Sequence, residues 1–300
     1  MEQRNENLRG ALLMMGSMAA FTLNDTCMKA LADEVPLAQA VFLRGTVTGA
    51  FMAVLAWRTG AFRVAVGRRD RGLIALRTAA EIAAAYFFIS ALFNMPIANA
   101  TAILQALPLS VSLAGAVFLG EAVGWRRLLA ILVGFIGVVM IVQPGARGFN
   151  HYSVYAVLAV LMVTVRDLAA RRLSRQVPSL VVALVAAVSV TLAFGAASLA
   201  SEWAPVSAQG WARLLAASVF IFGGYVFSVM AMRTGHIGAV TPFRYTSLLW
   251  ALVLGWVFFG EWPDAPTLLG AAIVVATGTF TLLREARLAR RAGPVGLRIR

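Results

Sequence analysis

Ten apolar runs, each about long enough to cross a lipid bilayer, dominate this 300-residue sequence. A hydrocarbon core of about 30 Å requires about 20 apolar residues in an α-helix. The ten expected spans are 8–31, 37–57, 73–93, 97–119, 125–142, 152–170, 178–200, 211–232, 238–259 and 266–283. The runs are continuous rather than alternating, which argues against a β-barrel. Because backbone groups in lipid must be satisfied within their own segment, we expect an all-α polytopic membrane protein.

The positive charges are distributed unevenly along the chain. The sequence is 60% hydrophobic and only 13% charged, which is more apolar surface than a water-soluble domain can hide. If the N-terminus is cytoplasmic, 20 of the 26 Lys and Arg residues lie inside, and outside there are only Lys29, Arg147 and Arg213. This bias predicts an inner (plasma) membrane protein with both termini in the cytoplasm. It also explains the net charge of +13 without nucleic acid, because the arginines lie near anionic lipid.

The chain repeats itself with an offset of about 140 residues. "GAVFLGE" at 115–121 matches "GWVFFGE" at 255–261. In the first span of each half, Thr22, Asp25, Lys29 and Leu31 correspond to Thr164, Asp167, Arg171 and Leu173. Each copy holds five spans, and since five is odd, the second copy enters the membrane inverted. Inverted repeats around a central cavity are typical of alternating-access transporters, although a duplication could also serve only to build a stable bundle.

The repeat divides the chain into three expected parts. They are a first repeat over 1–145, a second repeat over 150–284 and a basic cytoplasmic tail over 285–300. The Gly-Glu pair that closes the fourth span of each half resembles the most recognisable motif of the drug/metabolite transporter superfamily, EamA-like family. "FLRG" at 42–45 resembles the aromatic-Arg signature of that family, and "NLRGALLMMGSMAAFTLND" is similar to its riboflavin importers.

This resemblance covers about residues 8–283 and carries its own expectations. It implies a basket of helices around a central cavity, lined by spans 1, 3, 4, 6, 8 and 9, with spans 5 and 10 paired at the periphery. It does not fix the substrate, because relatives carry amino acids, nucleotide-linked compounds, vitamins and other small organic molecules. The two glutamates of the repeated motif, Glu121 and Glu261, are expected to be structural and to be bound by helix ends or loops.

Ionisable side chains within the spans are the candidates for gating or proton coupling, because each costs at least about 2.5–3.5 kcal/mol in lipid unless paired or hydrated. These candidates are Asp25, Arg44, Glu81 and Asp167. Their depths predict an Asp25–Arg44 pair in the outer half and an Asp167–Arg244 pair in the inner half. Each pair could latch a gate or serve as a permanent strut. Glu81 could carry a proton if it is buried, or could pair with Arg166 or Arg77.

The candidate substrate-binding residues combine aromatic rings with a few polar groups, which suits a flat or amphipathic organic molecule. They are Arg244, Tyr245, Thr241, Gln105, Asn99, Tyr86, Tyr225 and Arg166. Arg244 is favoured because Leu104 takes its place in the first repeat, so its charge is not a shared structural feature. Pro108 is expected to kink its span, and Pro242 to remove a backbone donor near the start of its span. The aromatic residues could alternatively serve only for packing.

These features predict a secondary transporter of a small organic metabolite such as riboflavin, an aromatic or other amino acid, or a nucleoside-like compound. We expect no cofactor, because no P-loop or metal-ligand spacing is present. An intramembrane enzyme would need a catalytic constellation, and none is apparent. A channel would not need inverted halves. The expected partners are the solute, a coupling proton and lipid, with a monomer and a homodimer both open, and import and export equally compatible.

Overall fold

The computed structural model is all-helical and describes residues 2–58, 67–121, 124–145, 149–174, 176–177, 179–234 and 237–291. Its elements are α1 (Glu2–Lys29), α2 (Leu37–Arg58), α3 (Arg68–Asn94), α4 (Ile97–Leu104), α5 (Leu107–Leu119), α6 (Trp125–Val142), α7 (Tyr152–Arg171), α8 (Ser179–Ser198), α9 (Ala208–Thr234), α10 (Ile237–Val240), the 3-10 segment η2 (Thr241–Tyr245), α11 (Thr246–Phe259) and α12 (Ala265–Arg291). Residues 285–291 of the expected tail continue α12, and residues 292–300 lie outside the described part.

Nine of the expected spans are confirmed as helical segments long and apolar enough to cross a membrane, within the described residues. The first expected span forms α1, a helix of 28 residues that is not among the nine. Its apolar stretch is interrupted by Asn24 and Asp25. Many large hydrophobic residues are exposed on the outside of the bundle, as is typical of a surface that faces lipid.

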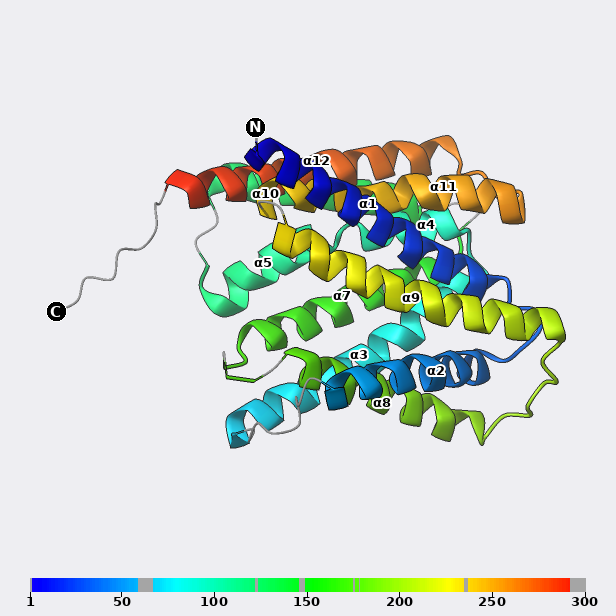
Figure 1. The fold of residues 1–300 in the computed structure, drawn as a ribbon. Coiled ribbons are helices and arrows are strands. Elements are labelled where there is room, and N and C mark those ends of the chain that lie inside the picture. The colour runs from blue at the N-terminus through cyan, green and yellow to red at the C-terminus, as the bar shows by residue number, and fades with distance from the viewer. Residues whose placement is uncertain are drawn as a thin grey trace.

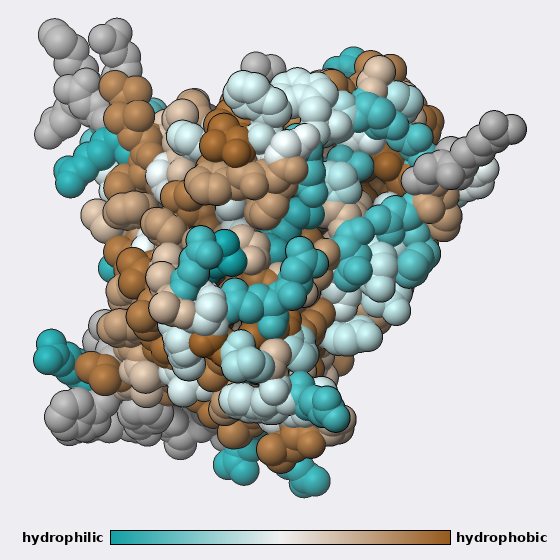
Figure 2. All heavy atoms as spheres, turned by 90° about the vertical axis from the view of Figure 1, so that its right-hand side faces the viewer, coloured by the Kyte–Doolittle hydropathy of each residue, from teal (hydrophilic) through white to brown (hydrophobic). Residues whose placement is uncertain are grey.

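The long helices lie side by side, and α1 begins at the same end of the bundle at which α12 ends (left in Figure 1). The main packing partners are α1 with α9, α3 with α7, α2 with α8, and α6 with α12. Figure 2 views the opposite end, where hydrophilic residues gather over the middle of the face and hydrophobic residues lie along its left-hand flank. The polar ends and apolar flanks indicate a bundle whose helices run across a membrane.

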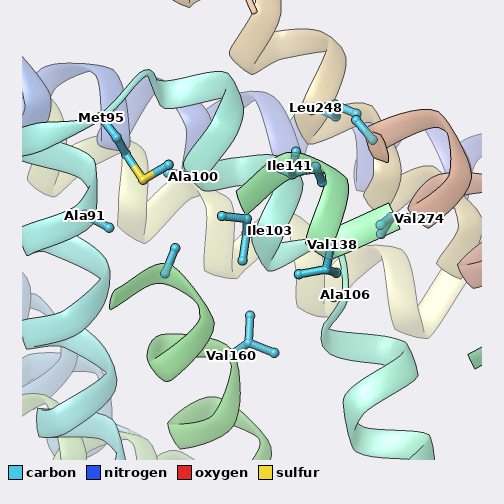
Figure 3. Packing of buried hydrophobic residues seen from close by; sticks show 13 residues of the cluster. Ala91, Met95, Ala100, Ile103, Ala106, Val138, Ile141, Val160, Leu248 and Val274 are labelled. Carbon is cyan, nitrogen blue, oxygen red and sulfur yellow. The ribbon is translucent and has the colours of Figure 1, made fainter. Parts of the chain in front are cut away.

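The largest buried cluster joins helices from both halves of the chain (Figure 3). Its members come from α3, α4, α6, α7, α11 and α12, and Ile103 of α4 and Val274 of α12 are completely buried. Small residues such as Ala91, Ala100 and Ala156 are also fully buried in it. Since lipid is as apolar as these side chains, close packing rather than a hydrophobic driving force holds such helices together.

The fourth and ninth expected spans are both broken inside the bundle. The first break falls at Gln105 and Ala106, between α4 and α5, and α5 carries Pro108 in its first turn. The second lies at η2, a 3-10 segment that contains Pro242. A proline interrupts the regular helix because it has no N–H and clashes with the preceding turn. The expected kink at Pro108 is confirmed, and at Pro242 the structure adds a 3-10 segment to the expected loss of a donor. Broken helices leave backbone groups available at depth, a recurrent feature of transporter binding sites.

The repeated Gly-Glu motif has the same local structure in both halves. Gly120 and Gly260 end their helices with φ of 68° and 65°, a left-handed conformation that glycine adopts without steric cost. The next N–H then donates back to a carbonyl, from Glu121 to Gly115 and from Glu261 to Gly255. A Cβ on Gly115 would lie 2.7 Å from the Glu121 carboxylate, so this glycine makes room for the folded-back side chain.

The crossing of α6 and α12 depends on two glycines that face each other. A Cβ on Gly137 would lie 2.8 Å from the carbonyl oxygen of Gly270, and the reciprocal distance is 2.5 Å. We expect Gly270→Leu to destabilise the protein by about 1–3 kcal/mol, because an added side chain must push the two backbones apart. The measurement is thermal unfolding in detergent. Gly49→Leu is the matched control, since a Cβ there meets no atom within 4 Å; equal melting temperatures for the two variants would contradict the prediction.

Candidate functional site

Glu81, Arg166 and Asp167 form a connected ion-pair network between α3 and α7. Arg166 Nη1 donates to Glu81 Oε1 at 2.9 Å, and its Nε donates to Asp167 Oδ1 at 2.9 Å. Arg77, one turn before Glu81, places Nη2 3.4 Å from the other oxygen of that carboxylate. Of the alternatives open for Glu81, the structure shows pairing, and with both Arg166 and Arg77. The Glu81 carboxylate is therefore held at both of its oxygens by guanidinium groups.

Asp25 and Arg44 meet through a third residue. Asn24 Nδ2 donates to Asp25 Oδ1 at 2.9 Å, and Arg44 Nη1 donates to Asn24 Oδ1 at 3.2 Å. Arg44 and Asp25 also interact electrostatically, without forming a direct ion pair. The direct salt bridge expected from their depths is therefore replaced by an amide-mediated link. This role of Asn24 could not be predicted from the sequence, because a buried amide can satisfy many different partners.

Tyr225 of α9 lies among the charged groups of the other helices. It interacts electrostatically with Glu81, Arg166 and Arg44. Its ring meets the ring of Phe21 on α1 edge-on, with 5.3 Å between the ring centroids. Tyr225 is nevertheless 47% exposed. Tyr225 is thus a partly exposed side chain whose charged neighbours come from α2, α3 and α7.

Arg244 is the arginine of this region that has neither a direct ion pair with a carboxylate nor an amide-mediated link to one within the described part of the chain. It lies in η2, is exposed, and interacts electrostatically with Asp167 and Arg166 on α7. The predicted Asp167–Arg244 ion pair is wrong, because Asp167 binds Arg166 instead. Arg166 is the adjacent residue on the same helix, so it reaches the carboxylate more directly than a side chain from η2 does.

We refer to the connected groups as the central polar cluster. Its members are Asn24, Asp25, Arg44, Arg77, Glu81, Arg166, Asp167, Tyr225 and Arg244. Four guanidinium groups meet three carboxylates in this cluster, so one positive charge remains uncompensated when all of them are ionised. By position, that charge belongs to Arg244. An exposed, uncompensated guanidinium can bind an anionic group through paired N–H donors.

Aromatic rings extend from this region along α3 and α7. The ring centroid of Tyr86 lies 5.5 Å from that of Phe87 and 6.2 Å from that of Tyr155. Tyr86 is 46% exposed, so its ring is available for further contacts. Tyr155 was not among the predicted residues, because its place in the sequence does not indicate a neighbour on α3. Such rings favour offset or edge-on stacking with a planar group.

The other predicted substrate residues do not join the central polar cluster. Gln105 is buried, and its Nε2 donates to Ser247 Oγ and to the carbonyl oxygen of Arg244, which links the two broken spans. Tyr245 is buried against α12, where a Cβ on Gly278 would overlap its hydroxyl. Asn99 is half-buried in α4. The last of them, Thr241, begins η2 and is half-buried.

Two ion pairs at opposite ends of the bundle connect the repeated motif to the repeated first span. Lys29 Nζ lies 2.9 Å from Glu261 Oε1, and Arg171 Nη1 lies 2.9 Å from Glu121 Oε1. We call the Lys29–Glu261 pair the α11-end corner and the Arg171–Glu121 pair the α5-end corner. The expectation that helix ends bind the motif glutamates is confirmed, since Glu261 also accepts the N–H of Ile97 at the start of α4, at 3.1 Å.

The two corners differ in burial. At the α11-end corner the side chains of Lys29 and Glu261 are 9% and 24% exposed. At the α5-end corner those of Arg171 and Glu121 are 47% and 39% exposed. The Lys29 ammonium also donates to the carbonyl oxygens of Leu92 and Met95, which tightens the first corner further. The repeat already aligned Lys29 with Arg171 and Glu121 with Glu261, so this pairing was detectable in the sequence although it was not predicted.

The chemistry of the central polar cluster is that of binding rather than of bond cleavage. Its groups are arginines, carboxylates, an amide and a phenol, and the described residues hold no group of three or more His, Cys, Asp or Glu that could bind a metal ion. No nucleophile with a neighbouring base is present in the cluster as defined above. Charged groups held between membrane helices mark a solute or proton pathway.

Comparisons with known proteins agree with this picture. A profile of the EamA-like transporter family matches the chain twice, over residues 8–143 and 152–283. The pseudopaline exporter CntI of Pseudomonas aeruginosa is 28% identical over 275 residues, which cover 89% of this chain and 93% of that protein. The riboflavin transporter of Vibrio cholerae is 26% identical over 295 residues, which cover 97% of this chain and 98% of that protein.

Two further comparisons extend the range of relatives. The S-adenosylmethionine uptake transporter of Rickettsia conorii is 28% identical over 204 residues, which cover 65% of this chain and 66% of that protein. A solved crystal structure superposes with a TM-score of 0.64 at 18% identity, covering 95% of this chain and 98% of that one. At this identity the superposition shows a shared fold only. The named relatives include an exporter and uptake proteins, so they do not indicate a direction of transport.

Proposed function

The chain belongs to the EamA-like transporter family, and from this premise we propose that it carries a small organic anion or zwitterion by alternating access. The observation that carries the proposal is the exposed, uncompensated guanidinium of Arg244 within the central polar cluster. The expected likeness to riboflavin transporters is confirmed by the comparison with the Vibrio cholerae protein. Metabolite transport itself follows from the family and from the names of the relatives.

The proposed architecture is two inverted repeats of five spans, over 1–145 and 150–284. It is supported by the packing partners, because exchanging the two halves turns the α1–α9 pair into the α7–α3 pair. The same exchange returns the α2–α8 and α6–α12 pairs onto themselves. The α6–α12 pair also fits the expected peripheral pairing of spans 5 and 10. A twofold relation in the membrane plane gives two mirror-related states around one site.

We assign the two corners as the gates of this cycle. The more deeply buried α11-end corner corresponds to a closed gate, and the more exposed α5-end corner to a loosened one. In the opposite state of the cycle, the α5-end corner would be closed and the α11-end corner loosened. The charge bias and the common end of α1 and α12 support cytoplasmic termini at the α5 end, in the inner membrane. The central polar cluster would then face the cytoplasm in this state. The protein would act as a monomer or a homodimer.

The substrate class follows from the groups around the central polar cluster. A carboxylate or phosphate group would bind Arg244, and a planar or apolar part would lie against Tyr86 or Tyr225, which are each about half exposed. Arg166 is already held by Glu81 and Asp167, so it orients the site rather than supplying a free charge. This arrangement favours a carboxylate-bearing ring compound, such as an aromatic amino acid, over an uncharged one.

The proposed test of transport is counter-flow in proteoliposomes that contain the purified full-length protein. Vesicles loaded with an unlabelled solute should transiently accumulate the same solute in labelled form from the outside. The panel contains aromatic amino acids, riboflavin, S-adenosylmethionine and a nucleoside. A channel would give flux without counter-flow, and an enzyme would change the solute chemically, so either outcome would remove the proposal.

We further propose that Asp25 is the proton carrier. Glu81 is held between two arginines, whereas the nearest hydrogen-bond partner of Asp25 is the neutral amide of Asn24. Asp25 can exchange a proton without breaking a direct ion pair, whereas a proton on Glu81 would break two. Glu81 and Asp167 then act as fixed partners of Arg166, and Arg44 senses the charge of Asp25 through Asn24.

Asp25→Asn is expected to abolish accumulation driven by a pH gradient while leaving counter-flow within about threefold of the wild type. The amide keeps the size and hydrogen bonding of the side chain but cannot exchange a proton. The measurement compares gradient-driven uptake with counter-flow in the same vesicles. Glu81→Gln serves as the comparison, and it should impair both assays because it removes the carboxylate that pairs with Arg77 and leaves Arg166 with Asp167 alone. Gradient-driven uptake retained by Asp25→Asn would exclude this residue as the carrier.

A further inference from the structure

Two cavities at the α5 end of the bundle adjoin each other at one arginine. The first is an apolar groove of about 580 Å³ between α3, α5, α6 and α7. The second is a polar pocket of about 430 Å³ formed by the start of α3 and the segment that follows α7. Arg172 lines both of them. Neither cavity contains a member of the central polar cluster, so both lie outside the transport site described above.

The apolar groove is open to the lipid. Its walls include Leu76, Val117, Phe118 and Leu161, and all four side chains are substantially exposed. The polar groups on its floor satisfy each other, since the hydroxyls of Ser110 and Thr164 are 2.8 Å apart. A lipid-facing groove with a self-satisfied floor offers nothing to a polar solute. It does match a hydrocarbon chain, which needs no hydrogen-bond partner.

The polar pocket has the opposite character. Arg69 and Arg172 line it, together with Asp70, Ser174 and Gln176. Asp70 accepts hydrogen bonds from the N–H and the hydroxyl of Ser174, at 3.2 and 2.6 Å, and so fixes the wall of the pocket. Around this end the arginines outnumber the carboxylates. The charged residues here are Arg68, Arg69, Arg71, Arg171 and Arg172 against Asp70 and Glu121.

Arg172 is held in a position that serves both cavities. Its Nη2 donates to the carbonyl oxygen of Phe118 at the end of α5, at 2.8 Å. This contact uses one of the five N–H groups of the guanidinium. The remaining donors stand at the junction where the apolar groove meets the basic pocket, at the membrane–water boundary of this end. A phospholipid with one acyl chain in the groove would place its phosphate group at that junction.

We propose that this junction is a binding site for one phospholipid with an anionic headgroup, in the leaflet at the α5 end. One acyl chain lies in the groove along α5 and α7, and the headgroup lies against Arg172 and Arg69. The occupant must combine a long apolar chain with negative charge, because the two cavities require both properties. The inference does not depend on the identity of the transported solute, since it uses no residue of the central polar cluster.

The test measures lipid retention by native mass spectrometry of the full-length protein in detergent. Phosphatidylglycerol and phosphatidylcholine with identical chains are compared. The wild type should retain one phosphatidylglycerol in preference to phosphatidylcholine. Arg172→Gln should weaken phosphatidylglycerol binding about fivefold, the effect of about one guanidinium near a lipid surface. Arg69→Gln is the second charge variant, and Leu161→Trp, which fills the groove, should reduce retention of both lipids.

Two control variants keep the experiment specific. Arg126→Gln removes another exposed arginine at the start of α6, and Leu192→Trp adds a ring to an exposed position on α8; neither residue lines the cavities. Both should bind phosphatidylglycerol as the wild type does. An equal loss in Arg126→Gln, full retention in Leu161→Trp, or no preference of the wild type for phosphatidylglycerol would overturn the proposal. Displacement by glycerol phosphate alone would indicate a site for soluble phosphate instead.

Discussion

Arg244→Ala is expected to lower the kcat/KM of transport by about 10- to 150-fold while the protein still folds and reaches the membrane, because a hydrogen-bonded charge contributes about 1.5–3 kcal/mol. Arg244 is exposed within the central polar cluster and has no carboxylate partner among the described residues. Its removal therefore leaves no buried charge unpaired, so the loss should appear in transport and not in stability.

The measurement is initial uptake in proteoliposomes for the solute identified by counter-flow, with melting temperature and membrane yield recorded for each variant. Arg244→Lys keeps the positive charge but loses the planar guanidinium with its paired N–H donors. It should retain part of the activity if the solute's carboxylate needs only a positive charge, and little if the carboxylate is bound through two parallel hydrogen bonds. Arg233→Ala is the matched control, an exposed arginine at the end of α9 outside the cluster. Unchanged uptake by Arg244→Ala would remove this residue from the site and leave the family assignment intact.

Glu261→Gln is expected to raise the rate at which an externally added, membrane-impermeant maleimide labels Cys27, by about tenfold or more. Cys27 is the only cysteine of the chain and lies half-buried two residues before Lys29. Loss of one partner of a buried ion pair costs about 3–5 kcal/mol. That cost falls on the state in which the α11-end corner is closed, so the population should shift toward the state open at that end.

The control is Glu121→Gln, which removes the corresponding carboxylate from the more exposed α5-end corner. It should leave the labelling of Cys27 unchanged or lower, because it disfavours the opposite closed state. The double variant Lys29→Glu with Glu261→Lys should return labelling toward the wild-type rate. An equal increase in Glu121→Gln, or no increase in Glu261→Gln, would show that the corners are permanent struts. Labelling by the same reagent from the α5 side only would contradict the proposed orientation.

The sequence predicted the helical class, ten spans, of which nine are confirmed among the described residues, and the break at Pro108, because these depend on local properties. Apolar length decides whether a segment can span lipid, and Pro108 and Pro242 interrupt a helix wherever they occur. It also predicted the family, because the Gly-Glu motif occurs once in each half. The structure adds the local reason for that motif, since Gly120 and Gly260 end their helices in the left-handed conformation.

The partners of individual charges could not be obtained in the same way. Depth alone suggested that Asp167 binds Arg244, whereas the neighbouring Arg166 binds it. Depth also suggested a direct contact between Asp25 and Arg44, which Asn24 mediates instead. Tyr245, adjacent to Arg244 in the sequence, packs on the other side against Gly278. A helix turns by about 100° per residue, so neighbours in sequence face different surroundings.

The sequence by itself therefore determined which segments cross the membrane, where they break and which residues correspond between the two halves. The tertiary structure alone decided which charges meet, which one remains without a partner, and how deeply each corner is buried. The physical reason is that span length and helix breaking act within one segment. Ion pairing and burial depend on the rotation and distance of several helices, and these are fixed only when contacts such as that between Gly137 and Gly270 form.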